Sequence, residues 1–191
     1  MNKKILKLAQ SAIFAALAFI SFTYFQIKIP VPGGGDFTSI HFGNIFLVVA
    51  ALTIGGFYGG LAGAVGMTIA DLLDPIYVIV APKTFILKLC IGLIVGLIAH
   101  RLKKINLSDD KKYIMKWAVI ASICGMAFNV VADPLVGYFY KRFLLGQPQD
   151  IATALAKLSA GVTLFNAVIT VIIANIIYNA IRPILKKVNL L

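Results

Sequence analysis

The sequence predicts an all-α membrane protein, a bundle of six transmembrane helices with both termini in the cytoplasm. Hydrophobic residues make up 60% of the 191 residues and charged residues only 13%, and the mean hydropathy is +0.94. Apolar segments recur along the chain at the length of helices that cross a bilayer. The basic residues concentrate between alternate segments, as the positive-inside rule requires. We expect a single domain, residues 1–191, because this length suits one compact unit.

The apolar segments are counted as six spans. The first covers about residues 8–25. The run 42–70 would be about 44 Å long as one helix, which exceeds a hydrocarbon core of about 30 Å. Four glycines between residues 55 and 60 predict a tight turn that divides this run into two short spans. The last three spans cover about residues 83–100, 113–140 and 151–181.

Two connectors between the spans have a distinctive composition. The polar stretch from Gln26 to Ser39 contains two prolines and three consecutive glycines. It is either an ordinary exposed loop or a lid that closes over a ligand. The connector 71–82 contains the apolar run 76–80, which is a candidate for a loop that folds back into the membrane.

The distribution of charge orients the bundle. With six spans and a cytoplasmic N-terminus, the inner segments hold twelve of the 18 basic residues and only Asp109 and Asp110. A count of five spans would place the basic connector after His100 outside, against the positive-inside rule. The twelve are Lys3, Lys4, Lys7, Arg101, Lys103, Lys104, Lys111, Lys112, Lys116, Arg182, Lys186 and Lys187.

Polar side chains collect toward the predicted outer ends of four spans. Polar groups at membrane depth are costly and usually face a cavity or one another. On the last span, Ser159, Thr163, Asn166 and Thr170 follow each other at helical spacing and share one face. Such a stripe either lines a ligand pocket or joins helices by hydrogen bonds, and both interpretations stay open for the hydroxyl residues.

Charged and amide side chains at this depth favour the pocket, because a charge inside a membrane needs a stronger reason than packing. Lys88, Asn129, Asp133 and Lys157 meet this condition. Pro134 follows Asp133 and removes a helical hydrogen-bond donor, which frees a backbone carbonyl for a ligand or marks a kink.

The predicted inner half of the bundle carries small residues instead. Ala12 and Ala16 form a small-xxx-small pair near the cytoplasmic end of the first span. Small residues allow another helix to approach closely, either within the fold or from a partner protein. We interpret this pair as a docking surface for a partner.

The chain lacks the motifs of an energy source or a catalytic centre. No G-x-x-x-x-G-K-[ST] motif, H-E-x-x-H motif or nucleophile elbow occurs. Cys90 and Cys124 lie in apolar spans without metal-ligand spacing, and no basic segment resembles a nucleic-acid-binding module. We therefore expect no enzyme, no cofactor and no nucleic-acid partner, but a binding subunit that depends on a partner for energy.

Several local features agree in order with one family. They are Ala12-xxx-Ala16, Ile40-His41-Phe42-Gly43-Asn44, the Gly-rich turn Gly55–Gly63 followed by Asp71, and Ala81-Pro82-Lys83. In these features, in length and in span number, nearly the whole chain resembles the S components of energy-coupling factor (ECF) vitamin transporters.

The resemblance implies a multi-pass protein of the cell membrane that captures a vitamin from outside with high affinity. An S component works with a transmembrane coupling subunit and two cytoplasmic ATPases, and ATP hydrolysis topples it to release the vitamin inside. The resemblance assigns Ala12 and Ala16 to the contact with the coupling subunit. The implied substrate contacts are Lys88, Asn129, Asp133, Lys157, Thr163 and Asn166, together with His41 and Asn44.

The vitamin expected from the resemblance is pantothenate, pyridoxine or the hydroxymethylpyrimidine precursor of thiamine. Lys88 and Lys157 would suit a carboxylate such as pantothenate, whereas Asp133 would suit an aminopyrimidine or a hydroxyl group. The alternative function is a self-sufficient secondary transporter or channel for a small polar solute, in which Asp133 would carry a proton.

Overall fold

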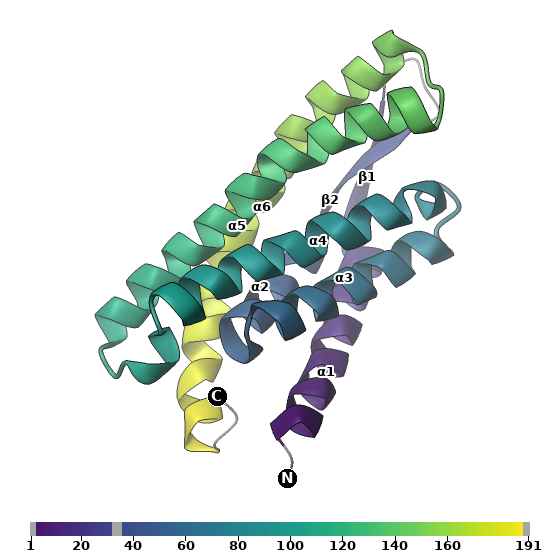
Figure 1. The fold of residues 1–191 in the computed structure, drawn as a ribbon. Coiled ribbons are helices and arrows are strands. Elements are labelled where there is room, and N and C mark those ends of the chain that lie inside the picture. The colour runs from purple at the N-terminus through teal and green to yellow at the C-terminus, as the bar shows by residue number, and fades with distance from the viewer. Residues whose placement is uncertain (1–2, 32–35, 189–191) are drawn as a thin grey trace.

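The computed structural model describes residues 3–31 and 36–188. Within these residues, six α-helices form a bundle and two short strands form a hairpin (Figure 1). The elements are α1 (Lys3–Tyr24), β1 (Gln26–Pro30), β2 (Phe37–His41), α2 (Gly43–Ile54), α3 (Gly56–Leu73), α4 (Ala81–Gly96), α5 (Lys111–Phe139) and α6 (Gln149–Lys187).

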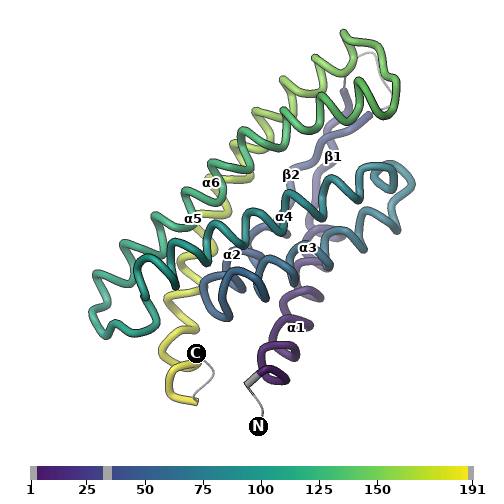
Figure 2. The backbone as a smooth tube through the Cα atoms, in the orientation of Figure 1, coloured from purple at the N-terminus to yellow at the C-terminus, as the bar shows by residue number. Residues whose placement is uncertain are grey.

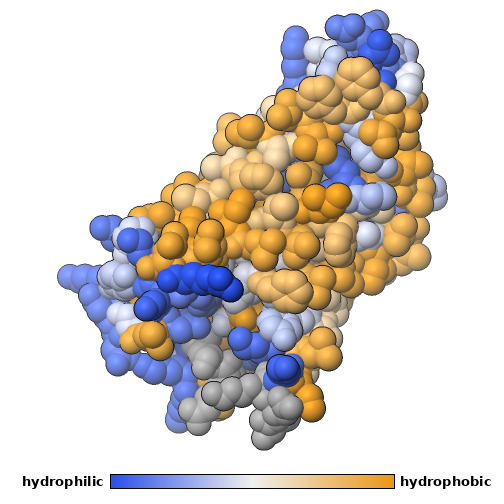
Figure 3. All heavy atoms as spheres, viewed as in Figure 1, coloured by the Kyte–Doolittle hydropathy of each residue, from blue (hydrophilic) through white to orange (hydrophobic). Residues whose placement is uncertain are grey.

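Five helical segments are long and apolar enough to cross a membrane, which confirms the predicted multi-pass membrane bundle. They include α1, α3, α5 and α6, and the fifth is α4 with its short extensions, Val78–Leu102. Figure 3 shows an apolar band across the face in view, between hydrophilic ends. Such a band matches the hydrocarbon layer of a bilayer.

Helix α2 differs from the other five. With 12 residues it is about 18 Å long, too short to cross a hydrocarbon core of about 30 Å. All of its residues except Phe46 are buried, and it packs against α1, α3, α4 and α6. The second predicted span is therefore a short helix in the centre of the bundle.

The predicted glycine turn between α2 and α3 is confirmed. Gly55 adopts a φ of 96°, a conformation that residues with a side chain rarely adopt. The glycines that follow bring α3 against α4: an added Cβ at Gly92 would lie 2.1 Å from the Cα of Gly60. An added Cβ at Gly96 would lie 2.1 Å from the backbone nitrogen of Gly56. The two backbones are thus in direct contact.

The polar stretch after α1, predicted to be an exposed loop or a lid, forms an antiparallel hairpin in its described residues. Strand β1 pairs with β2 in a register that sets Ile27 opposite Ile40 and Pro30 opposite Phe37. The glycine-rich part of the predicted lid, residues 32–35, lies outside the described residues.

The connector between α3 and α4 is a turn followed by the 3₁₀ helix Val78–Val80, which leads directly into α4. The Asp74 carboxylate holds this turn, because it accepts a hydrogen bond from the backbone of Ile76 and forms a salt bridge with Lys28 of β1. The apolar run 76–80 thus forms the end of this turn and the 3₁₀ helix that leads into α4.

Both termini lie at the same end of the bundle as the α4–α5 connector (Figures 1 and 2). The Arg182 guanidinium near the end of α6 donates to the carbonyls of Ile105 and Ser108 in that connector, at 3.2 and 3.1 Å. The hairpin and the α5–α6 connector lie at the opposite end. The positive-inside rule predicts that the end with the termini faces the cytoplasm.

Candidate functional site

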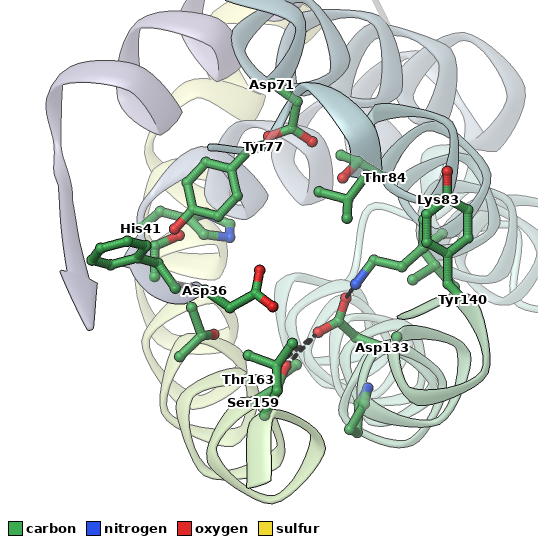
Figure 4. Close-up of a pocket in the computed structure, with 18 of the residues that line it drawn as sticks. Asp36, His41, Asp71, Tyr77, Lys83, Thr84, Asp133, Tyr140, Ser159 and Thr163 are labelled. Carbon is green, nitrogen blue, oxygen red and sulfur yellow. Dashed lines mark hydrogen bonds and ion pairs between the residues drawn. The ribbon is translucent and has the colours of Figure 1, made fainter. Parts of the chain in front are cut away.

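A polar cavity lies at the end of the bundle that carries the hairpin, among α3, α4, α5, α6 and strand β2 (Figure 4). Its polar lining residues are Asp36, Thr38, Ser39, His41, Asp71, Tyr77, Lys83, Thr84, Lys88, Asn129, Asp133, Tyr140, Lys141, Ser159, Thr163 and Asn166. Four aromatic rings complete the wall, those of Phe22, Phe37, Tyr77 and Tyr140.

Asp133 joins three helices at the centre of the cavity wall. Its Oδ1 lies 2.9 Å from the ammonium of Lys83 on α4. Its Oδ2 accepts hydrogen bonds from the hydroxyls of Ser159 and Thr163 on α6, at 2.9 and 3.3 Å (Figure 4). A partly buried ion pair with additional hydrogen bonds satisfies both charges. Asp133 thus positions α4 and α6 around α5.

Asn166 ties strand β2 to α6. Its Nδ2 donates to the carbonyl of Ser39 at 3.0 Å, and its Oδ1 accepts from the backbone N–H of His41 at 3.2 Å. The His41 ring in turn packs against Phe22 of α1, with ring centroids 4.5 Å apart. The hairpin is thereby fixed as one wall of the cavity.

Polar contacts also close the side of the cavity near the α5–α6 connector. The Asp36 carboxylate forms an ion pair with Lys141 and accepts a hydrogen bond of 2.6 Å from the Gln147 amide. The Tyr140 hydroxyl donates to the carbonyl of Ile79 at 2.7 Å. These contacts join the segment between α5 and α6 to the residue before β2 and to the connector before α4.

Several buried polar groups of the cavity have no partner among the described residues. These atoms are the Nδ1 of His41, the Oδ2 of Asp71, the hydroxyl oxygen of Tyr77 and the Oδ1 of Asn129. Lys88 is only 6% exposed and makes no salt bridge with a described residue. Because buried polar groups without partners are costly, a cluster of them in a cavity indicates a polar ligand.

Two ring side chains at the cavity are held in their neutral forms. Burial and the nearby Lys88 charge lower the pKa of His41 to about 3. Burial raises the pKa of Tyr77 to about 12. At neutral pH, both side chains therefore contribute hydrogen-bonding groups without charge.

The buried neutral His41 predicts a loss of stability in mild acid. The unfolded chain protonates this residue near pH 6.5, so its contribution is complete above that pH and decreases as the pH falls toward 3. Between pH 7.5 and 5 we expect a loss of about 2 kcal/mol, visible as a lower melting temperature in detergent. The drop should be smaller for His41→Gln, and an equal drop would contradict the assignment.

Six of the predicted contact residues line the cavity: His41, Lys88, Asn129, Asp133, Thr163 and Asn166. The other two lie outside its lining. Lys157 is exposed on another face of α6, and Asn44 is buried in the first turn of α2. Asp36, Asp71, Tyr77, Lys83, Thr84, Tyr140, Lys141 and Ser159 also line the cavity but were not among the predicted contacts.

The predicted docking pair lies away from the cavity. Ala12 and Ala16 are both exposed on α1. Phe22 is the residue of this helix that lines the cavity. Exposed large apolar side chains, Leu8 and Ile13 among them, are found on the same helix. The docking role of the pair stays a prediction.

Comparisons with known proteins agree with this architecture. Residues 2–183 match the family described as "ECF-type riboflavin transporter, S component". An "Uncharacterized protein in gap 3'region" of Pyrococcus woesei is 32% identical over 77 residues, which cover 40% of this chain and 49% of that protein. The match thus spans about half the length of that curated relative. No solved structure gives a significant match. Because the family match covers nearly the whole chain, the protein belongs to the family of ECF-type riboflavin transporter S components.

Proposed function

We propose that the protein captures a water-soluble vitamin from outside the cell for an ATP-driven ECF importer. The observation that carries this proposal is the cavity at one end of an apolar bundle, where several buried polar groups have no hydrogen-bond partner within residues 3–31 and 36–188. A ligand would supply these partners in a site shielded from water, and such a site suits tight binding of a small polar molecule.

The energy for import comes from partner subunits in this proposal. The family match supports a transmembrane coupling subunit and two cytoplasmic ATPases. Ala12 and Ala16 on the exposed face of α1 offer a surface that a partner helix could approach closely. The chain itself would bind its ligand and catalyse no reaction.

The charges of the cavity favour an uncharged ligand. Three cationic and three anionic side chains line it, and they are Lys83, Lys88, Lys141, Asp36, Asp71 and Asp133. An added net charge would be uncompensated in this buried site. The aromatic rings of the wall offer faces on which a flat heterocycle can stack. We therefore propose a neutral ring vitamin such as riboflavin, pyridoxine or hydroxymethylpyrimidine, and not the pantothenate anion.

Identification of the bound ligand tests this proposal. Mass spectrometry of small molecules that copurify with the detergent-solubilised protein should detect one of the neutral ring vitamins. Isothermal titration calorimetry with riboflavin, pyridoxine, hydroxymethylpyrimidine and pantothenate should then show tight binding of that vitamin and weak binding of pantothenate. Tight binding of pantothenate alone would contradict the charge argument.

Reconstitution distinguishes a binding subunit from a self-sufficient transporter. Asp133 is engaged by Lys83, Ser159 and Thr163, which favours a fixed carboxylate over a proton carrier. In proteoliposomes that contain this protein alone, we expect vitamin binding without accumulation under a proton or sodium gradient. Gradient-driven accumulation would establish the secondary transporter instead.

A further inference from the structure

Helix α3 contributes one carboxylate to the cavity wall. Asp71 is the one residue of α3 that lines the cavity, and it is 2% exposed. In Figure 4 its carboxyl group lies beside Thr84 of α4 and faces the cavity. Its Oδ2 accepts no hydrogen bond from any described residue. Since a buried carboxylate oxygen without a donor is costly, its place in the cavity wall indicates a ligand that supplies one.

The two lysines of α4 in the cavity differ in whether a carboxylate lies close to their ammonium groups. The Lys83 ammonium is paired with Asp133 at 2.9 Å, so its charge is compensated within the protein. Lys88 lines the same cavity and is more deeply buried than Lys83, at 6% exposure, but has no carboxylate of a described residue within salt-bridge distance. Among the described residues, the cavity therefore offers an unpaired carboxylate oxygen on Asp71 and a cationic donor without a salt-bridge partner on Lys88.

We propose that Asp71 and Lys88 together recognise the edge of a heterocycle that presents a hydrogen-bond donor next to an acceptor. The ring N–H or amino group would donate to the Asp71 Oδ2, and the neighbouring carbonyl or ring nitrogen would accept from the Lys88 ammonium. This inference rests on the proposed function and specifies the class of substrate. Each charged group thereby gains a hydrogen-bond partner, and the ligand adds no charge of its own.

Two kinds of ring edge satisfy this pair. The imide edge of riboflavin has an N–H between two carbonyls, and the aminopyrimidine edge of hydroxymethylpyrimidine has an amino group beside a ring nitrogen. Either edge can give one hydrogen bond to a carboxylate and receive one from an ammonium, and hydrogen bonds to charged groups are the stronger ones. Pantothenate lacks such a ring and carries a charge.

The test uses two isosteric or nearly isosteric variants, Asp71→Asn and Lys88→Met, and calorimetry with riboflavin and hydroxymethylpyrimidine as probes. For the probe that binds the wild-type protein, each variant should lose about 10- to 100-fold in affinity, as expected for a hydrogen bond to a charged group. Asp150→Asn is the matched control, because Asp150 is exposed at the start of α6 and does not line the cavity. Its affinity should equal that of the wild type.

A second ligand, whose affinity should rise in the variant and not fall, distinguishes a specific effect from misfolding. Asp71→Asn leaves the cavity with one excess positive charge, so this variant should bind pantothenate more tightly than the wild type does, while it binds the neutral probe less tightly. A misfolded variant would lose both. Size-exclusion chromatography checks that each variant remains monodisperse.

The outcomes separate this inference from the proposed function. If the wild type binds a probe and both variants bind it with unchanged affinity, Asp71 and Lys88 do not contact the ligand and this inference is wrong. The proposed function is not affected by that result. If the wild type binds neither the two probes nor any other vitamin tested, the proposed function fails and this inference fails with it.

Discussion

Replacement of Ala12 or Ala16 with tryptophan is expected to abolish vitamin uptake by the assembled transporter while vitamin affinity stays nearly unchanged. Both alanines are exposed on α1, and neither lines the cavity. A helix that packs against such small residues approaches closely, and an indole ring would hold it several ångströms away. Uptake of labelled vitamin by cells with the complete transporter, and calorimetry on the purified subunit, measure the two quantities separately.

The control for these variants is a tryptophan at another exposed apolar position. Ile172 of α6 is 56% exposed and does not line the cavity, so Ile172→Trp should leave both uptake and affinity intact. If Ala16→Trp lowered vitamin affinity as much as uptake, the alanines would act on the fold or the cavity, and the docking surface would be excluded.

Gly92→Ala is expected to prevent folding or to destabilise the protein severely. The added Cβ would lie 2.1 Å from the Cα and 2.6 Å from the nitrogen of Gly60, so it meets backbone and not a side chain that can rotate away. If α3 and α4 moved apart to make room for this Cβ, they would also lose the close backbone contact between Gly56 and Gly96. We expect a loss of about 3 kcal/mol or more, which is large for a single methyl group.

The yield of monodisperse protein and its melting temperature in detergent measure this effect. Gly161→Ala is the matched control, because a Cβ at Gly161 of α6 would meet no atom within 4 Å. That substitution should stabilise the helix by about 0.5–1 kcal/mol. A Gly92→Ala protein that melts like the wild type would show that the backbones of α3 and α4 are not in contact.

Hydropathy and charge were sufficient to predict the bundle, because both are properties of whole segments. The turn at Gly55 was predictable from local composition, since only glycine adopts its φ of 96° without strain. The hairpin was missed because prolines and glycines between residues 30 and 35 dominated the interpretation as a loop. The alternation of Ile27, Lys28 and Ile29 before them was the signal that could have identified β1.

The position of a polar side chain along its helix was easier to predict than the direction in which that side chain points. Thr163 was predicted from depth and helical face together, and it lines the cavity, as do Asn129 and Asp133, which were predicted from depth and polarity. Lys157 was predicted from depth alone. It lies two residues before Ser159, about 200° around the helix, and so it points away from the face that the cavity uses. The contribution of Asp71 depends on how α3 crosses α4, which no pattern within a single helix reveals.

The hydrogen bonds of Asn166 to β2 should affect the rate at which a bound ligand is released. One of its N–H groups and its carbonyl oxygen are hydrogen-bonded to the backbone of β2, so this side chain holds a wall of the cavity in place. Any molecule that departs past that strand must wait until both bonds open together. For different ligands that leave by this route, the dwell time should therefore depend on one shared event, the detachment of the strand, even where their equilibrium affinities differ widely.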